Sequence, residues 1–194
     1  MKTRVHVWHL EMTEQLPAAE LPDPERRYEL RKVDTSLPEF NRFLYVAVGA
    51  DWQWHVRLGW TYADWQNFLN QPNTETWIAY SQGTPLGYFE LQEQKPGSTE
   101  ICYFGLLPEF IGQGYGRCLL EDAISKAWAI GGKRVWLHTC TLDHPQALPN
   151  YLARGFKVFD EEDLDDDLPD EPIQPWPDAN KPRVTPFLKK TKAP

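Results

Sequence analysis

The sequence predicts an α+β fold in which helices pack on a mixed, mostly antiparallel sheet, followed by a proline- and acid-rich C-terminal tail. Two observations predict this fold. From residue 28 onward, the predicted segments follow in the order strand, two helices, three strands, helix, strand, helix, strand. Short turns at Gln82–Pro85 and Lys95–Ser98 join the three middle strands, so these strands should be antiparallel neighbours.

Alternating or β-branched residues mark the strands. The first such pattern lies ahead of the main run of elements and predicts an extra N-terminal strand. The last pattern is short and gives way to acidic residues. In chain order, the predicted strands are Arg4–Glu11, Tyr28–Val33, Thr76–Ser81, Leu86–Gln92, Glu100–Leu107, Arg134–Cys140 and Phe156–Phe159.

Two helices are predicted between the second and third strands. Ser36 and Glu39 form a capping box, which predicts a helix over Pro38–Val48. Thr61 is placed to cap the second helix, whose apolar residues share one face. The segment between these helices, Asp51–Trp60, is rich in tryptophan.

Two more helices are predicted after the three middle strands. Apolar residues at helical spacing predict a helix over Gly116–Ile130, ended by the glycine pair that follows it. Asp143 is placed to cap a further helical segment. Pro149 should kink or restart that segment, because proline lacks a backbone N–H.

The length and composition suit one domain with extensions at both ends. The 194 residues are 41% hydrophobic and 13% aromatic, which is enough for one packed core. Residues 1–27 are predicted to form an N-terminal extension that contains the extra strand. Residues 28–160 are predicted to form the domain, and residues 161–194 an acidic, proline-rich tail.

The net charge of −8 comes from one segment. Asp160–Glu171 carries nine acids in twelve residues and no base, so the remaining residues carry a net charge of +1. We expect no nucleic-acid partner, because the chain has no basic stripe. An acidic run is usually a solvated surface; the alternative is that it attracts a cationic acceptor or partner.

Neither a membrane association nor a metal site is expected. The chain has no run of about 18 apolar residues, which a membrane-spanning helix would need. Cys102, Cys118 and Cys140 are odd in number, widely spaced and without metal-ligand spacing. This pattern predicts reduced thiols and a cytoplasmic protein.

A glycine-rich junction, Phe104–Arg117, lies between the third middle strand and the long helix. Gly112, Gly114 and Gly116 occupy alternate positions just before the helix. Backbone N–H groups at a helix N-terminus have no helical partner, so they form a site for a phosphate or pyrophosphate. The residues after the glycines do not fit a P-loop or a dinucleotide fingerprint. A tight turn is the alternative role of the glycines.

The stretch LLPEFIGQGYGRCLL resembles the central motif of the GCN5-related N-acetyltransferase (GNAT) family, whose loop binds the pyrophosphate of acetyl-CoA. Gly114 and Gly116 match the glycines of the motif, while Ile111 departs from its usual Gln or Arg. The resemblance implies the GNAT fold for residues 28–160 and acetyl-CoA as a co-substrate. It implies a binding site made by Phe104, Leu106, Leu107, Gly112, Gln113, Gly114, Tyr115, Gly116 and Arg117.

A second stretch, ALPNYLARGF, is similar to another motif of the same family. Ala147, Tyr151, Gly155 and Phe156 match its four marked positions. The resemblance implies that Tyr151 is the acid that protonates the departing CoA thiolate. The alternative is a tyrosine that packs the helix on the sheet.

Several residues are candidates for the base that deprotonates the amine. Glu100 lies on the strand where relatives carry a catalytic glutamate, so the resemblance implies that it is the base. A carboxylate beside a turn, or catalysis by an ordered water, is an equal alternative. His138 and His144 are further candidates. Part of Asp51–Trp60 is expected to reach the acceptor, through aromatic or cation–π contact.

The resemblance implies direct transfer of an acetyl group from acetyl-CoA to an amine, without a metal or a covalent acyl-enzyme. The acceptor is expected to be a small-molecule or peptide amine, and the protein a monomer or homodimer. One alternative is a non-catalytic acyl-CoA-binding or regulatory module on the same fold. Another is a protein-interaction module that acts through the acidic, proline-rich tail.

Overall fold

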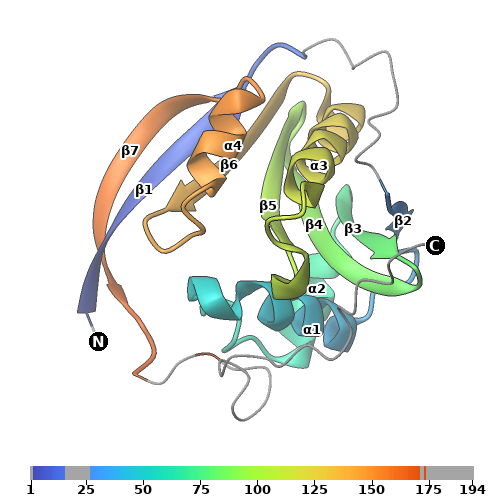
Figure 1. The fold of residues 1–194 in the computed structure, drawn as a ribbon, viewed down its shortest axis with the longest axis horizontal. Coiled ribbons are helices and arrows are strands. Elements are labelled where there is room, and N and C mark those ends of the chain that lie inside the picture. The colour runs from blue at the N-terminus through green and yellow to red at the C-terminus, as the bar shows by residue number, and fades with distance from the viewer. Residues whose placement is uncertain (1, 16–26, 171–172, 174–194) are drawn as a thin grey trace, which may run out of the picture.

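The computed structural model describes residues 2–15, 27–170 and 173. These residues form seven strands, four α-helices and two short 3-10 helices. The helices lie on both faces of one sheet, which confirms the predicted α+β class (Figure 1). Residues 16–26 of the predicted N-terminal extension, and most of the predicted tail from residue 171, lie outside the described residues.

The strands form a single mixed sheet in the order β2-β3-β4-β5-β6-β1-β7. All neighbours are antiparallel except β5 and β6, so the prediction for the three middle strands β3, β4 and β5 is confirmed. A strand lies at each predicted place. The observed strands are β1 Lys2–Met12, β2 Glu29–Lys32, β3 Thr74–Ser81, β4 Thr84–Lys95, β5 Ser98–Leu106, β6 Arg134–Cys140 and β7 Lys157–Asp167.

The sheet opens between β5 and β6. These two strands pair in parallel only where Ser98–Glu100 meets Arg134–Trp136. Beyond this short ladder they diverge toward their C-terminal ends, as Figure 1 shows. A parallel pair that separates leaves the backbone groups of its facing edges available to another molecule.

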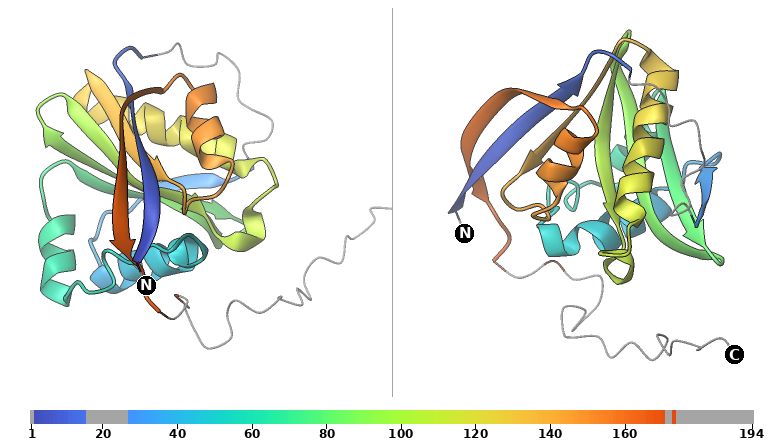
Figure 2. Two further views of the ribbon diagram at one scale, coloured as in Figure 1. Left: turned by 90° about the vertical axis from the view of Figure 1, so that its left-hand side faces the viewer. Right: turned by 45° about the horizontal axis from the view of Figure 1, so that its top comes forward.

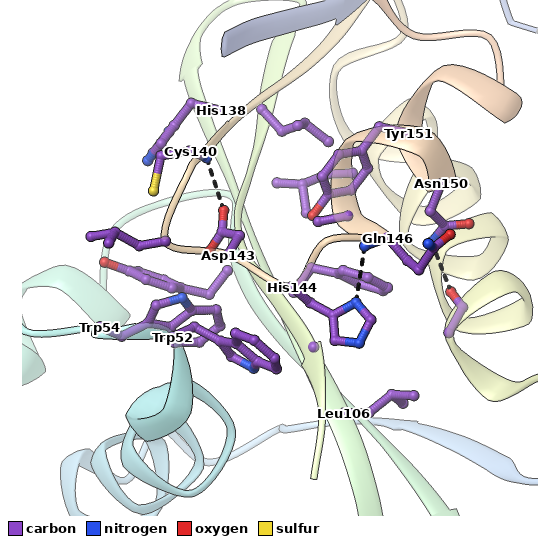
Figure 3. Close-up of a pocket in the computed structure, with 18 of the residues that line it drawn as sticks. Trp52, Trp54, Leu106, His138, Cys140, Asp143, His144, Gln146, Asn150 and Tyr151 are labelled. Carbon is purple, nitrogen blue, oxygen red and sulfur yellow. Dashed lines mark hydrogen bonds between the residues drawn. The ribbon is translucent and has the colours of Figure 1, made fainter. Parts of the chain in front are cut away.

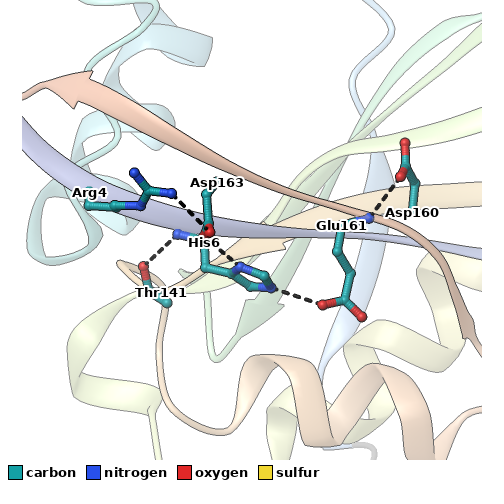
Figure 4. Close-up of polar contacts among 6 residues, drawn as sticks. All are labelled: Arg4, His6, Thr141, Asp160, Glu161 and Asp163. Carbon is teal, nitrogen blue, oxygen red and sulfur yellow. Dashed lines mark hydrogen bonds and ion pairs between the residues drawn. The ribbon is translucent and has the colours of Figure 1, made fainter.

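The N-terminal strand β1 lies between β6 and β7 and pairs with both in antiparallel register. The last strand is therefore longer than predicted, because it extends beyond Phe159 to Asp167 along β1. His6 explains part of this pairing. Its Nδ1 lies 2.8 Å from an oxygen of Asp163, and its Nε2 lies 3.0 Å from an oxygen of Glu161 (Figure 4). The acidic run is thus an exposed edge strand.

The helices cover the sheet in two groups. Helices α3 (Tyr115–Gly131) and α4 (Ala147–Ala153) pack on one face, over a core from β1, β4, β5 and β6. Helices α1 (Pro38–Gly49) and α2 (Tyr62–Leu69) pack on the other face, as the two views of Figure 2 show. No helix in the described part of the chain is long and apolar enough to cross a membrane.

Of the three predicted N-caps, those by Ser36 and Asp143 are wrong, and the one by Thr61 is confirmed. The N-cap of α1 is Leu37, and the hydroxyl of Ser36 donates instead to the carbonyl of Leu69 at 3.4 Å. Pro38 begins the helix without a side-chain cap. Since proline has no backbone N–H, this position has no donor that needs a partner. Thr61 caps α2 as predicted, in a reciprocal capping box with Asp64.

The start of α4 also differs from the prediction. Asp143 does not cap this helix: its carboxylate accepts from the hydroxyl of Thr139 at 2.6 Å and from the amide of Cys140 at 3.0 Å. The helix begins at Ala147, so Pro149 lies in its first turn. No intrahelical bond needs the proline N–H there, so no kink is required; the helical segment starts again just before Pro149, which is the other predicted outcome.

Candidate functional site

A cavity of about 720 Å³ fills the opening between β5 and β6. Its walls come from elements far apart in the sequence: the N-terminus of α3, helix α4, the loop after α1, and strands β1 and β7. Figure 3 shows side chains of the loop after α1 and of helix α4 facing it from two sides. The volume is in the range of small-molecule and cofactor sites.

The N-terminus of α3 faces this cavity through its glycines. Gly114 is the N-cap in the left-handed conformation (φ 87°), and no described side chain caps this helix end. Gly112 also has a positive φ of 79°, and a Cβ added there would meet nothing within 4 Å. The first turn carries no acidic residue. Its N–H groups therefore form a site suited to an anion.

The predicted cofactor residues divide into two groups. Phe104, Leu106, Gly112, Gly114, Gly116 and Arg117 line the cavity. Leu107, Gln113 and Tyr115 are not among the lining residues. The amide of Leu107 bonds to the carbonyl of Leu86 at 2.9 Å, and Gln113 Nε2 donates to the carbonyl of Glu109 at 2.5 Å. The Tyr115 ring is buried and meets Phe110 edge-on.

A bulge in β5 turns part of its backbone toward the cavity. Tyr103 pairs with Glu90 of β4, but the next pair is Ile101 with Leu91, so Cys102 is an extra residue in β5. A bulge bends its strand and re-aims side chains and backbone groups. Residues from Ile101 to Leu106 line the cavity in an unbroken run that includes the bulge.

Tyr151 reaches the cavity from α4. The residue is 7% exposed, and its ring packs edge-on against Phe104, with 6.2 Å between the ring centroids. Figure 3 shows its hydroxyl directed into the cavity. Burial, with a smaller effect from the charge of Asp143, raises the pKa of the Tyr151 phenol well above its usual range. The phenol therefore keeps its proton, as a general acid must.

Glu100 and His138 form a pair at the point where β5 and β6 separate. Glu100 is 7% exposed and is not among the lining residues of the cavity. One carboxylate oxygen accepts a hydrogen bond from Gln94, and the other lies 3.6 Å from Nδ1 of His138. His138 does line the cavity, and the neighbouring Glu100 raises its pKa.

His144 lies in the loop before α4, where it links two walls of the cavity. Its ring meets Trp52 edge-on, with 5.1 Å between centroids. Its Nδ1 accepts from the amide of Gln146 at 3.0 Å. These contacts give His144 a packing role at the side of the cavity opposite to His138 (Figure 3).

The tryptophan-rich loop after α1 forms the wall on the α1 side. Its lining residues are Trp52, Gln53, Trp54, His55 and Val56. Trp54 packs directly on Gly49, where an added Cβ would lie 2.3 Å from the indole ring. A glycine is therefore required at this place for the indole to reach its position.

A buried ion pair anchors the same loop. Nη1 of Arg57 lies 2.7 Å from a carboxylate oxygen of Glu90, and both side chains are buried. Aromatic rings surround the guanidinium, including those of Phe68 at 4.1 Å and Tyr103 at 4.4 Å from Cζ. Sequence reasoning missed this pair, although a lone glutamate within an apolar strand is a signal for a buried partner.

Strand β7 supplies a part of the cavity wall that sequence reasoning also missed. Leu164 and Asp166 line the cavity, and a carboxylate oxygen of Asp166 lies 3.3 Å from Nε2 of His55. These residues belong to a run of acids that is typical of a solvated tail. Only the long-range pairing with β1 brings them to the site.

The family comparison agrees with this geometry. Residues 30–156 match the model of the acetyltransferase (GNAT) family. No curated protein matches the chain.

Solved structures of low sequence identity share the fold. A GCN5-related N-acetyltransferase from Sphaerobacter thermophilus is 19% identical, with a TM-score of 0.60 over 82% of this chain and 50% of that one. A putative acetyltransferase from Novosphingobium aromaticivorans is 16% identical, with a TM-score of 0.57 over 84% and 64%. A Bacillus subtilis acetyltransferase in complex with CoA is 18% identical, with a TM-score of 0.51 over 67% and 76%. The chain thus spans half to two thirds of the length of the first two structures.

Proposed function

The chain belongs to the GNAT acetyltransferase family, and from that premise we propose that it transfers an acetyl group from acetyl-CoA directly to an amine. The observation that carries the proposal is the α3 N-terminus, which faces a cavity formed by two diverging strands. The N–H groups of this helix end suit the pyrophosphate of acetyl-CoA. The edge of β5 suits the pantetheine arm, which can pair with backbone groups like an added strand.

Direct transfer is supported by the state of the cysteines at the cavity. Burial raises the pKa of Cys102 well above its usual range and also raises the pKa of Cys140. A thiol must become a thiolate before it attacks a thioester. Both cysteines are therefore poor nucleophiles, and we assign no acyl-enzyme to the reaction.

The acid and base come from opposite sides of the cavity. Tyr151 is the proposed acid that protonates the thiolate of the departing CoA, a role supported by its position at the cavity and by the raised pKa of its buried phenol. The Glu100–His138 pair is the site of proton removal from the amine. The acceptor is proposed to be a small-molecule or peptide amine that enters beside Trp52 and Trp54.

Calorimetric titration with acetyl-CoA and with CoA tests the proposal. We expect micromolar binding, about 7–8 kcal/mol. Gly116→Trp should abolish it, because Gly116 lines the cavity and its added Cβ meets only Leu106, at 3.6 Å. Gly59→Trp is the matched control, since Gly59 is outside the lining and has open space around it. Absence of binding by the folded wild type would overturn the proposal.

An assay of CoA thiol release then distinguishes an enzyme from a non-catalytic binding module. The wild type should release CoA from acetyl-CoA faster when an amine is added, and the amine should become acetylated. A protein that binds acetyl-CoA tightly but accelerates no transfer would be a non-catalytic module on the same fold.

A further inference from the structure

We infer that His138 takes the proton from the attacking amine, and that Glu100 acts through His138 as a positioning residue. This inference rests on the proposed function and changes the assignment of its base. The sequence resemblance points to Glu100, whereas the cavity geometry points to its partner.

Glu100 is too enclosed to meet an acceptor directly. Its side chain is 9% exposed, and it lies outside the lining of the cavity. Both of its carboxylate oxygens are engaged, one by Gln94 and the other by His138. A general base must come within hydrogen-bond reach of the proton it removes. His138, whose Nδ1 lies 3.6 Å from this carboxylate, does line the cavity.

His138 meets the requirement that Glu100 does not. Its side chain is 51% exposed, and it lines the cavity on β6 (Figure 3). Glu100 faces Nδ1, so Nε2 is the ring nitrogen left for an acceptor. A carboxylate at one ring nitrogen fixes the tautomer and makes the other nitrogen the proton acceptor. The pair therefore has the arrangement of an oriented histidine base.

Among the titratable groups around His138, Glu100 has the largest effect on its pKa. The other titratable groups near the ring are His9 of β1, Glu162 of β7 and Asp143 of the following loop, and the thiols of Cys102 and Cys140 line the same cavity. Glu162 is already bound to His9 at 3.0 Å, and Asp143 accepts from Thr139 and Cys140. Contact with Glu100 is accordingly the largest cause of the raised pKa of His138.

The proton transfers balance for a neutral amine. The amine nitrogen forms a bond to the thioester carbonyl carbon, and Nε2 of His138 takes one N–H proton. The carbon–sulfur bond breaks with its electron pair on sulfur, which takes the phenol proton of Tyr151. Solvent then returns the proton from the imidazolium to the phenolate, so amide and CoA thiol are the only products.

Two measurements on full-length variants test the assignment. The first is the NMR pH titration of the His138 ring in the wild type and in Glu100→Gln, which needs no acceptor. The second is the pH profile of CoA release from acetyl-CoA with hydroxylamine, which is small enough to enter the cavity, after subtraction of the uncatalysed reaction. Calorimetry with acetyl-CoA checks that each variant keeps its binding site.

We expect His138→Gln to lose about a hundredfold or more in turnover while acetyl-CoA binding persists. Glu100→Gln should lower turnover less than His138→Gln does, and should move the acidic limb of the profile to lower pH, together with the NMR pKa of His138. The direction follows because loss of the carboxylate destabilises the imidazolium. His9→Gln, a neighbouring histidine outside the cavity lining, should keep turnover near that of the wild type.

The opposite pattern would overturn the inference. If Glu100→Gln abolishes turnover while His138→Gln retains it, Glu100 is the base itself. An acidic limb that stays in place while the His138 titration moves would also exclude His138. A wild type that binds no acetyl-CoA, or accelerates no transfer, would overturn the proposed function as well, even if the NMR titrations show the pair.

Discussion

Arg57 and Glu90 form a buried ion pair, with 2.7 Å between Nη1 and a carboxylate oxygen, directly beneath the loop that walls the cavity. Asn41 of α1 and the hydroxyl of Tyr45 add hydrogen bonds to this group, the first to Glu90 and the second from the amide of Arg57. The pair thereby connects α1, the loop and β4. It anchors the loop whose tryptophans, Trp52 and Trp54, line the cavity.

Removal of one partner of this pair should be strongly destabilising. We expect Arg57→Met to lower the free energy of unfolding by about 3–5 kcal/mol, because it leaves the Glu90 carboxylate buried without a counter-charge. Denaturant unfolding measures this loss. The double variant Arg57→Met/Glu90→Leu should recover most of the stability. A double variant as unstable as the single one would show that the charge pairing is not the cause.

Gly49 and Gly59 provide a matched test of the loop. Gly49→Ala should displace the Trp54 indole, which lies 2.3 Å from the added Cβ, and cost about 1–3 kcal/mol. Gly59→Ala should have little effect, because nothing lies within 4 Å of its added Cβ. Tryptophan fluorescence and thermal unfolding report both. Equal effects of the two variants would count against a tight contact at Gly49.

Tyr151→Phe should separate catalysis from binding. The variant keeps the ring packed on Phe104 but removes the proton donor, so turnover should fall about a hundredfold or more. Calorimetry should show unchanged affinity for acetyl-CoA. In the wild type, the raised pKa of Tyr151 keeps its phenol protonated, so the alkaline side of the pH profile should show no loss at the ordinary tyrosine pKa of about 10. Full activity of Tyr151→Phe would exclude the acid role.

His6 should make the pairing of β7 depend on pH. Asp163, and then Glu161, raise the pKa of His6 in the folded protein. The stabilisation is therefore complete below the unfolded-state pKa of about 6.5 and is lost as the pH rises through the raised value. We expect β7 amides to lose hydrogen-exchange protection over this range, once intrinsic rates are corrected.

The variant His6→Gln is the control for that pH dependence. It should remove the pH-dependent change in β7, while amides of β2 and β3, at the other side of the sheet, stay unaffected in both proteins. An equal loss of protection in all strands would indicate global destabilisation instead of a local effect at His6.

The elements that depend on local sequence were predicted well. The strand Arg134–Cys140 was placed to the residue, and Thr61 caps α2 because its partner Asp64 lies three residues away. Ser36 and Asp143 show the limit of local rules. Both are good capping residues, but in the folded chain Ser36 donates to the carbonyl of Leu69 and Asp143 accepts from Thr139, so neither caps its helix.

Long-range pairing accounts for what the sequence did not reveal. Acidic residues disfavour strands, yet β7 continues to Asp167 because β1, more than 150 residues earlier, offers a pairing edge and histidines. Asp166 lies at the cavity only because of that pairing. Likewise, the enclosure of Glu100 by His138 depends on where β5 and β6 separate, which no spacing within either strand encodes.

The most direct test of the account is an NMR titration of the folded protein with acetyl-CoA, followed through the backbone amides. The largest shifts should occur at Gly114, Gly116 and the rest of the first turn of α3, together with the edge of β5 from Phe104 to Leu106. Amides of β2 should not move. Saturable binding whose shifts lie away from the α3 N-terminus, or no shifts at all, would contradict the central claim that this helix end and the opening beside it hold the acetyl donor.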